Sequence, residues 1–472
     1  MLRYLFIFLG CAVLVGCDKS SADAPPSGLA YEGPFRSAEN LRFLYDKTYL
    51  NKQGQRVIEH EIFDQVFALI DQSTRFVLLD MFLFNDFKGK QTEAPRSLSE
   101  ELTQALLRHK QAYPQCEMIL ITDPINTVYG AIPSPYLERL KRAGIRVEMT
   151  DLQKLPDSNA LYSPLWRKFL SENKMLAGFS LSNPFDKGKV PLDSMLSLIN
   201  FKANHRKVVI GANDKSISAI VGSANPHDGS GAHENLAVHF SGQAALDLLE
   251  TERAVLRFSE SKGLDFQAKT AHSANINGLS IRVITESAIK KAVLSAINAS
   301  QSGDNIDMAM FYLSERDIIR ALGAAQKRGA AIRLLLDPNK DAFGREKNGI
   351  PNRQVAHELA EQGVSVRWCL TQGEQCHSKM LMIRYNDGNS RIILGSANFT
   401  RRNINGFNLE TDTEIRGAHH HPAILGLEQY FESRWLSRED QKTSLPYNSF
   451  KDESRFKYWQ YRLMEASGLS TF

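Results

Sequence analysis

The chain has 472 residues, which is longer than a domain with a single hydrophobic core usually is, so two domains or a fused duplication is expected. Its content of hydrophobic residues (43%) and charged residues (23%) is typical of a globular protein and excludes disorder on a large scale. The formal net charge of +4 argues against a dedicated nucleic-acid-binding protein, in which a strongly basic surface is expected.

The chain opens with the features of an export signal. Arg3 supplies a positive charge, and the apolar run over residues 5–15 is shorter than the roughly 20 residues needed to span a bilayer. The run ends in Leu-Val-Gly before Cys17, which resembles the lipidation site of bacterial lipoproteins. We predict that residues 1–16 are a signal peptide and that Cys17 is lipidated. A signal peptide cut elsewhere and an uncleaved anchor are the alternatives.

Residues 17–36 are polar and rich in Ser and Pro, a composition typical of a flexible tether. A protein on such a tether is expected on the periplasmic face of a bacterial membrane. Asp18 follows the lipidated cysteine and resembles an inner-membrane retention signal, so the inner membrane is favoured over the outer one.

The rest of the chain contains a long-period duplication. Residues 66–86 and 293–315 share an amphipathic stretch, a strand-length apolar run and an Asp-Met-x-x-Phe core. Matching units of helix and strand follow in both halves, and Gly144 and Gly363 end equivalent helices. This alternation predicts an α/β sandwich in each half, the two being related by a pseudo-two-fold duplication.

The repeat also suggests domain boundaries. We predict a first domain over residues 37–260, a linker over residues 261–277 and a second domain over residues 278–437. Residues 151–200 form an insertion with several aromatic side chains, and residues 438–472 form a C-terminal tail. The insertion suits either a bilayer interface or a packed lid helix over a cleft, and the sequence leaves both open.

Each half contains a predicted β-hairpin with the same polar residues. The first hairpin begins with His205 and Lys207, the second with His377 and Lys379, and Asn, Asp and Gly residues mark both turns. Because residues i and i+2 of a strand point to one face, the His and Lys of each pair project together. Each hairpin returns to a Gly-Ser-Ala-Asn sequence, which brings in Ser223, Asn225, Ser396 and Asn398.

These groups suit the cleavage of a phosphodiester without a metal ion. One neutral imidazole can attack phosphorus while a protonated imidazole gives a proton to the leaving oxygen. Two ammonium and two amide groups can stabilise charge on the non-bridging oxygens. Either short motif alone is common in surface strands and turns, but both at matching offsets in two halves indicate a site. No carboxylate cluster for Mg²⁺ or Ca²⁺ accompanies them, so we predict no metal and no other cofactor.

The paired motifs resemble those of the phospholipase D superfamily, in which two His-Lys-Asp motifs from two α/β halves meet at one active site. The likeness covers residues 37–437. It implies a site at the interface of the two domains, with Ser223 and Ser396 in support of the catalytic residues. The catalytic residues so implied are His205, Lys207, Asn225, His377, Lys379 and Asn398.

The resemblance also implies an acidic residue downstream of each motif that orients a histidine. Glu234 and Glu410 are the matching candidates, since each opens a strand-like run, and exposed strand ends are the alternative. In the family the N-terminal motif usually attacks, which implies that His205 is the nucleophile and His377 the general acid.

The chain departs from the family pattern in one respect. Ala212 and Arg384 stand where the signature aspartate is expected, seven residues after each histidine, and Asp214 and Asp387 lie in the turns instead. That aspartate is mainly structural in the family, so its loss leaves activity open and indicates a divergent subgroup.

Three functions compete for this set of motifs. The membrane tether and the aromatic insertion favour a phosphodiesterase or phosphatidyltransferase acting on phospholipids at a membrane surface, of the phospholipase D or cardiolipin synthase type. An extracytoplasmic endonuclease is the alternative, although family nucleases are usually single-motif dimers and more basic. A non-catalytic relative conflicts with two intact His-x-Lys pairs. We expect a monomer with no nucleic-acid partner, and the sequence leaves hydrolysis and transfer open.

Of the five cysteines, Cys11 lies in the predicted signal peptide, so three remain beside Cys17 after processing, too few for a disulfide framework and without zinc-finger spacing. Cys116 stands apart from the others. Cys369 and Cys376 enclose a short polar loop just before His377, and we predict a disulfide between them, with two free buried thiols as the alternative.

Overall fold

The structure is a computed structural model. It describes residues 28–91, 95–159, 162–164, 166, 179–183, 185, 188–268, 278–470 and 472. The predicted signal peptide, Cys17, most of the tether and much of the linker lie outside the described residues. Within the described ranges, no helix combines the length and the apolar character that crossing a bilayer requires.

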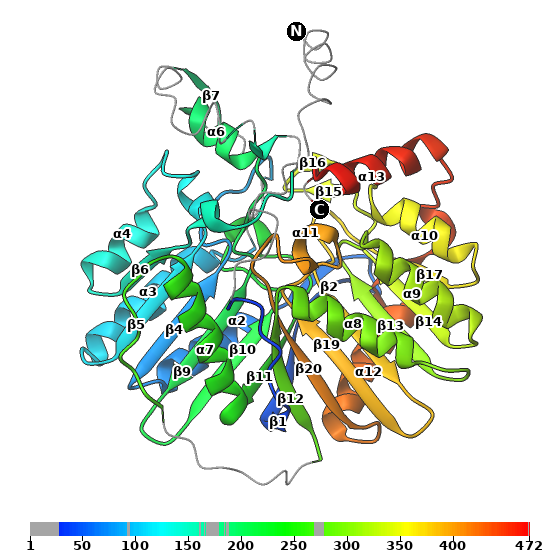
Figure 1. The fold of residues 1–472 in the computed structure, drawn as a ribbon, viewed down its shortest axis with the longest axis horizontal. Coiled ribbons are helices and arrows are strands. Elements are labelled where there is room, and N and C mark those ends of the chain that lie inside the picture. The colour runs from blue at the N-terminus through cyan, green and yellow to red at the C-terminus, as the bar shows by residue number, and fades with distance from the viewer. Residues whose placement is uncertain are drawn as a thin grey trace.

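Two nine-stranded mixed sheets stand side by side, the first half of the chain on the left of Figure 1 and the second half on the right. The first sheet has the order β21-β2-β11-β10-β9-β4-β5-β6, with β3 paired to β2. Its strands are β2 (Glu39–Asn51), β3 (Arg56–Glu59), β4 (Phe76–Met81), β5 (Glu117–Thr122), β6 (Arg146–Met149), β9 (Lys207–Ala212), β10 (Ile217–Gly222), β11 (Asn235–Ser241) and β21 (Gln441–Lys442).

The second sheet has the order β1-β12-β20-β19-β18-β13-β14-β17-β22. Its strands are β1 (Arg36–Ser37), β12 (Ser280–Thr285), β13 (Asn305–Met310), β14 (Ala331–Leu336), β17 (Ser365–Cys369), β18 (Lys379–Arg384), β19 (Asn389–Gly395), β20 (Thr411–Ala418) and β22 (Ser444–Pro446). The run β20-β19-β18-β13-β14-β17 repeats the run β11-β10-β9-β4-β5-β6 of the first sheet. The duplicated α/β fold expected from the sequence is therefore confirmed.

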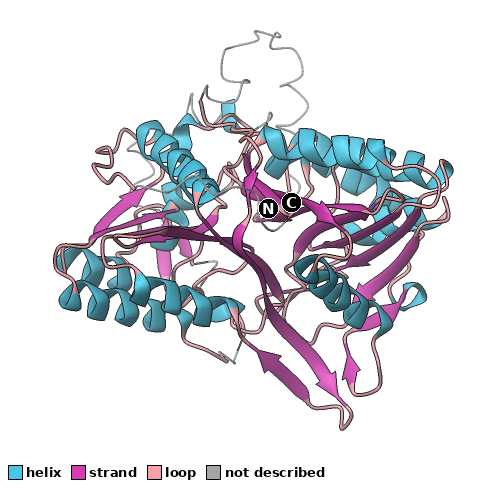
Figure 2. Cartoon of the chain, turned by 90° about the horizontal axis from the view of Figure 1, so that it is seen from below, coloured by secondary structure: helices cyan, strands magenta, loops and turns pink. Residues whose placement is uncertain are grey.

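Helices cover the sheets in layers, as Figure 2 shows from a second direction. Their apolar faces contribute to the cores on both sides of each sheet, as expected for amphipathic helices. Those outside the first sheet are α2 (Ile62–Gln72), α3 (Leu98–Ala112) and α4 (Pro135–Arg142), and those outside the second are α8 (Ser287–Ala299), α9 (Arg316–Lys327) and α10 (Asn352–Ala360). A central core includes side chains of both sheets together with α7 (Gln243–Phe258) and α12 (Pro422–Leu436).

The remaining elements lie at one end of the sheets in Figure 1. They are the hairpins β7 (Ser180–Ser182) with β8 (Lys189–Pro191) and β15 (Asp341–Ala342) with β16 (Arg345–Glu346), and the helices α6 (Leu192–Leu198), α11 (Arg401–Ile404) and α13 (Arg455–Ser467).

Short segments of each half pair with the other half. Strand β1 pairs with β12 of the second sheet, and β21 from the C-terminal tail pairs with β2 of the first sheet. Two bridges join the loops ahead of the motif histidines to the opposite half: Asn204 pairs with Leu409, and Cys376 pairs with Glu234. The loops that carry the two histidines are therefore held by backbone contacts across the pseudo-two-fold axis.

Candidate active site

Each motif histidine precedes a central strand by two residues and is fixed by the other half of the chain. His205 lies before β9, and its backbone N–H donates to the carbonyl of Leu409 at 2.9 Å. His377 lies before β18, and its backbone N–H donates to the carbonyl of Glu234 at 2.8 Å. Both side chains are buried to about nine-tenths and line one cavity.

The imidazole of His205 is oriented by a carboxylate. Its Nδ1 lies 2.9 Å and 3.1 Å from the two carboxylate oxygens of Glu410, which also accepts hydrogen bonds from Ser396 and Asn403. Burial alone would raise the pKa of Glu410, but its interactions with His205 first, and then with Lys207 and Ser396, hold that pKa below its usual range. Glu410 therefore carries a negative charge and fixes the tautomer with a proton on Nδ1.

The imidazole of His377 is oriented by an amide instead. Its Nδ1 lies 3.1 Å from Oδ1 of Asn235, and the hydroxyl of Ser223 donates to the same oxygen at 3.0 Å. Ser223 also accepts the backbone N–H of Leu236, as Ser396 accepts that of Thr411. Asn235 thus occupies in the first half the position that Glu410 occupies in the second.

The prediction that Glu234 orients a histidine is wrong. Its carboxylate accepts a hydrogen bond from the hydroxyl of Tyr430 at 2.9 Å and forms a buried ion pair with Arg434. Glu234 and Asn235 are neighbours in an extended segment, so their side chains point to opposite faces and only Asn235 faces the histidine. The site therefore has one orienting carboxylate, not the two that the sequence suggested.

The two motif lysines are buried behind the histidines and are not among the described residues that line the cavity. The Nζ of Lys379 donates to the carbonyl of His377 at 2.8 Å, and Lys207 makes the equivalent bond to His205. Burial lowers the pKa of Lys207 to about 7. Burial, reinforced by the charge of Lys207, lowers the pKa of Lys379 well below its ordinary value. An anion bound nearby would favour the protonated form of both.

Two aromatic rings repeat the pseudo-symmetry around the histidines. The ring of Phe82 lies edge-on to His205, with centroids 4.9 Å apart, and Phe311 lies edge-on to His377 at 5.1 Å. Each ring also lies within 5.0–5.4 Å of a motif lysine nitrogen. These rings exclude water from one side of each imidazole and fix its plane.

Burial favours the neutral form of both histidines. Burial lowers the pKa of His205 to about 4, and the charge of Glu410 opposes that change only in part. Burial and the neighbouring charge of Lys379 lower the pKa of His377 well below its ordinary value. A phosphate anion between them would favour protonation of one imidazole and leave the other as a nucleophile.

The cavity has a volume of about 460 Å³ and receives residues from both halves. The amides of Asn225 and Asn398 line it beside the histidines, and the Oδ1 atom of Asn398 has no hydrogen-bond partner within the described chain. Among the described lining residues, four are cationic and none is acidic. The cationic residues are Lys202, Arg345, Lys347 and Arg402, and the aromatic residues are Phe82, Phe87, Tyr129, Phe185, Phe201, Phe311, Tyr312 and Phe343. The cavity therefore suits an anionic ligand with apolar parts.

Two further histidines, which the sequence motifs did not indicate, also line this cavity: His227 and His233. His233 is 3% exposed, and its ring centroid lies 5.8 Å from that of His377. Its Nδ1 accepts the backbone N–H of Gln375 at 3.4 Å, while its Nε2 has no partner within the described chain. Burial lowers the pKa of His233 to about 3, so its Nε2 is a neutral donor. A histidine just ahead of Asn235 was the only signal in the sequence.

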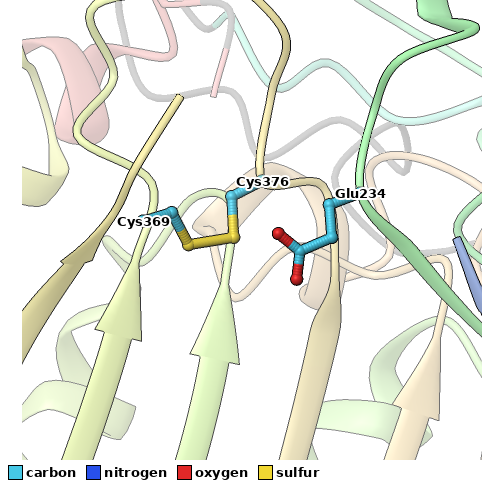
Figure 3. Close-up of side chains that lie close together, drawn as sticks. All are labelled: Glu234, Cys369 and Cys376. Atoms are coloured by element: carbon cyan, nitrogen blue, oxygen red, sulfur yellow. A yellow bond between two sulfur atoms is a disulfide. The ribbon is translucent and has the colours of Figure 1, made fainter. Parts of the chain in front are cut away.

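The predicted disulfide is present ahead of His377. Cys369 and Cys376 are bonded, with Cα atoms 6.2 Å apart, and both are buried, as is the free thiol of Cys116. Figure 3 shows the carboxylate of Glu234 beside the bridge. Because both sulfurs are in the disulfide and Glu234 is paired with Arg434, these three residues do not offer a free ligand set for a metal ion.

The surroundings of Arg384 show what replaces the signature aspartate in the second half. Its guanidinium forms ion pairs with Asp307 on β13 and Glu428 on α12. In the first half, the small Ala212 pairs with Phe76 at the far end of β9. Both positions therefore lie at the end of their strand that is farther from the histidine.

Comparisons with known proteins bear on the fold and on the second half of the chain. Residues 293–435 match the family model described as cardiolipin synthase, PLD-like domain. The phosphatidylserine synthase of Haemophilus influenzae Rd KW20 has a similar structure, with a TM-score of 0.55, 11% sequence identity, and coverage of 93% of this chain and 96% of that one.

A phospholipase D family member, Nuc from Salmonella typhimurium, is 22% identical over 35% of this chain and 97% of its own, with a TM-score of 0.28. No curated protein matches the chain. Residues 293–435 are therefore a PLD-like domain, and the similarity in fold extends along nearly the whole chain.

Proposed function

We propose that this protein is a phosphodiesterase or phosphatidyltransferase that acts on phospholipids through a covalent phosphohistidine. The observation that carries the proposal is the pair of buried imidazoles, His205 and His377, in one cavity with cationic and without acidic lining among the described residues. Similarity in fold to a phosphatidylserine synthase supports a lipid substrate. The aromatic side chains of the cavity suit the apolar parts of such a substrate.

The unequal partners of the two imidazoles support a division of roles. Glu410 holds the proton of His205 on Nδ1, which leaves the Nε2 lone pair free to attack phosphorus. The carboxylate also stabilises the positive charge that the imidazole gains when the bond to phosphorus forms. Asn235 offers His377 no charge, so a protonated His377 gives up its proton more readily. We therefore assign His205 as nucleophile and His377 as general acid.

The reaction then runs in two steps. His205 forms a bond to phosphorus as the ester bond breaks, and His377 transfers its proton to the leaving oxygen. In the second step His377 takes a proton from water or from an acceptor alcohol, whose oxygen displaces His205 from phosphorus. The amides of Asn225 and Asn398 are placed to donate to the non-bridging oxygens. Hydrolysis and transfer differ only in the acceptor.

Histidine variants with two substrates test this mechanism. His377→Asn should retain activity on a nitrophenyl phosphodiester, whose leaving group needs little acid help, and should lose activity on phospholipid. His205→Asn should be inactive on both, since no phosphohistidine can form. Wild-type activity should persist in excess EDTA. Rescue of His205→Asn alone by the good leaving group would reverse the roles, and loss of wild-type activity in EDTA would contradict a metal-free reaction.

Lipid analysis identifies the substrate class. Thin-layer chromatography of lipids from overexpressing cells should show a change with the wild-type protein and none with His205→Asn. Unchanged lipids, together with cleavage of DNA by the purified protein, would support an endonuclease instead.

We further propose that the chain is anchored through a lipid on Cys17 at the periplasmic face of the membrane. Fatty-acid labelling that persists in Cys17→Ala would contradict this anchor.

A further inference from the structure

Helix α13 carries an exposed apolar stripe. Its side chains Phe456, Trp459 and Leu463 are 79%, 68% and 70% exposed. At 100° per residue, their spacing of three and four positions places all three on one side of the helix. Tyr461, on the opposite side, is fully buried against the second half of the chain. Large apolar side chains gathered in this way mark an interaction surface.

The charges beside this stripe are positive. Arg455 and Arg462 are seven residues apart on the helix, so both lie along the same edge of the stripe. Neither forms an ion pair with a carboxylate within the described part of the chain, and Arg462 donates only to the hydroxyl of Tyr458. Aromatic and aliphatic side chains flanked by unpaired arginines are the composition of helices that lie in the interface of an anionic bilayer.

The end of this helix is attached to the wall of the cavity. Arg402, which lines the cavity, donates to the backbone carbonyls of Gly468 and Ser470 just after α13. The ring of Phe472 lies 6.1 Å from that of Tyr312, a second lining residue. In Figure 1, α13 lies at the same end of the molecule as α11 and the hairpin β15–β16, which contribute lining residues.

A second exposed apolar element lies at this end of the molecule. Phe179 and Leu181, at the start of the hairpin β7–β8, are 65% and 48% exposed. Figure 1 places β7 and α13 at the same end, on opposite sides of the elements that line the cavity. A flat surface that contacts both would cover the region between them.

We propose that this end of the molecule docks on an anionic lipid bilayer. Phe456, Trp459 and Leu463 enter the interface, and Arg455 and Arg462 contact lipid phosphates. The hairpin β7–β8 makes the second contact, so the cavity faces the bilayer from which a lipid substrate would enter. The relevance of this surface to catalysis rests on the proposed function, but docking itself requires no chemistry.

Quenching of tryptophan fluorescence tests the insertion of α13. The full chain is mixed with phosphatidylglycerol-containing vesicles whose acyl chains carry bromine, which quenches only tryptophans that enter the apolar region. Wild type should be quenched, and Trp459→Phe should lose most of that quenching. Equal quenching of the two proteins, or none in either, would overturn the proposal. This measurement is valid whether or not the N-terminus carries a lipid, because it reports on one side chain.

Activity separates docking from chemistry. The triple variant Phe456→Ser, Trp459→Ser, Leu463→Ser should raise KM for phospholipid vesicles by at least about tenfold, since burial of three apolar side chains is lost. Its kcat/KM on a soluble nitrophenyl phosphodiester should be unchanged. Leu436→Ser, which removes a side chain of 48% exposure from α12, is the matched control and should behave as wild type.

The outcomes distinguish this surface from the proposed function. Quenching of Trp459 without any phospholipid turnover would support docking and contradict the lipid reaction. Phospholipid turnover with unaltered KM in the triple variant would contradict docking alone. A change in oligomeric size in the triple variant, with vesicle kinetics intact, would assign the stripe to a second copy of the chain and overturn the bilayer proposal.

Discussion

Replacing Glu410 by glutamine tests the asymmetry between the two histidines most directly. Glutamine keeps the shape of the side chain and removes its charge, so the partner of His205 becomes a neutral amide like that of His377. The hydroxyl of Ser396 can turn to accept the new amide N–H, while Asn403 still donates to the remaining oxygen. The fold around the site should therefore be preserved, which thermal denaturation can check.

The size of the effect follows from the hydrogen bond that changes. A bond to a charged group contributes about 1.5–3 kcal/mol, against about 0.5–1.5 kcal/mol for a neutral pair. Loss of the charge should therefore cost about 1–2 kcal/mol as His205 becomes cationic on phosphorylation, because the pair is buried at 2.9 Å. At about 1.4 kcal/mol per factor of ten, this is a decrease of roughly 5–30-fold in the rate of attack.

The assay measures the first step alone. Rapid mixing with a nitrophenyl phosphodiester gives a burst of nitrophenolate whose rate reports the attack of His205, since this leaving group needs little proton transfer. Glu410→Gln should slow the burst, whereas Asn235→Ala should affect it little and should slow phospholipid turnover. A burst rate in Glu410→Gln within twofold of wild type, in a protein of unchanged stability, would refute the assignment of His205 as the nucleophile that the carboxylate assists.

Three further outcomes follow from the same contacts. The pKa of His377 is depressed, so kcat/KM should fall as pH rises through the acidic range, because the general acid loses its proton there. Asn235→Asp should raise the pKa of His377 and move this fall to higher pH, which a pH profile of kcat/KM would show. Reducing the disulfide should lower the free energy of unfolding by about 2–3 kcal/mol in denaturant titrations, and a variant with serine at both positions should not respond to reductant. Arg434→Ala should cost about 3–5 kcal/mol because it leaves the charge of Glu234 buried and unpaired, and adding Glu234→Gln should recover part of that loss, whereas no recovery would contradict the ion pair.

The fold was predictable because its signals are periodic and occur twice. The apolar runs of the two halves form the equivalent strands β4 and β13, in which Met81 and Met310 pair with the two motif lysines. The shared Asp-Met-x-x-Phe core found these strands, although its match is offset by two residues from the structural equivalence. The disulfide was predictable because its two cysteines enclose a loop of six residues. In these cases neighbouring residues in the sequence decide the structure.

The wall of the cavity was not predictable in the same way, because contacts from distant segments decide it. The lysines were expected beside the phosphate, but their ammonium groups turn back to the carbonyls of the histidines two residues earlier. His233 belongs to no motif and reaches the site only because the loop ahead of β11 crosses to the second half. The aromatic insertion is described only in part, and its choice between lid and membrane contact stays a prediction.

The residue that orients His377 differs by one position along the strand from the residue that the sequence suggested. Glu234 follows Asn225 by nine positions, whereas Glu410 follows Asn398 by twelve, so the sequence alone could not align them. The hydrogen bonds of the two motif serines supply the alignment and select Asn235. Neighbouring residues of an extended strand point to opposite faces, so Glu234 forms a buried ion pair while Asn235 contacts the histidine.

Because each orienting residue acts on the histidine of the other half, exchanging the two should reverse the roles. In the double variant Asn235→Glu, Glu410→Asn, the carboxylate would assist His377 and the amide would face His205. Tested with the nitrophenyl phosphodiester, the swapped protein should tolerate His205→Asn and be inactivated by His377→Asn, the opposite of the unswapped chain. Stability measured alongside would show whether the longer side chain is accommodated at position 235. If a folded swapped protein still requires His205 for the burst, the direction of attack is set by the cavity and not by the carboxylate.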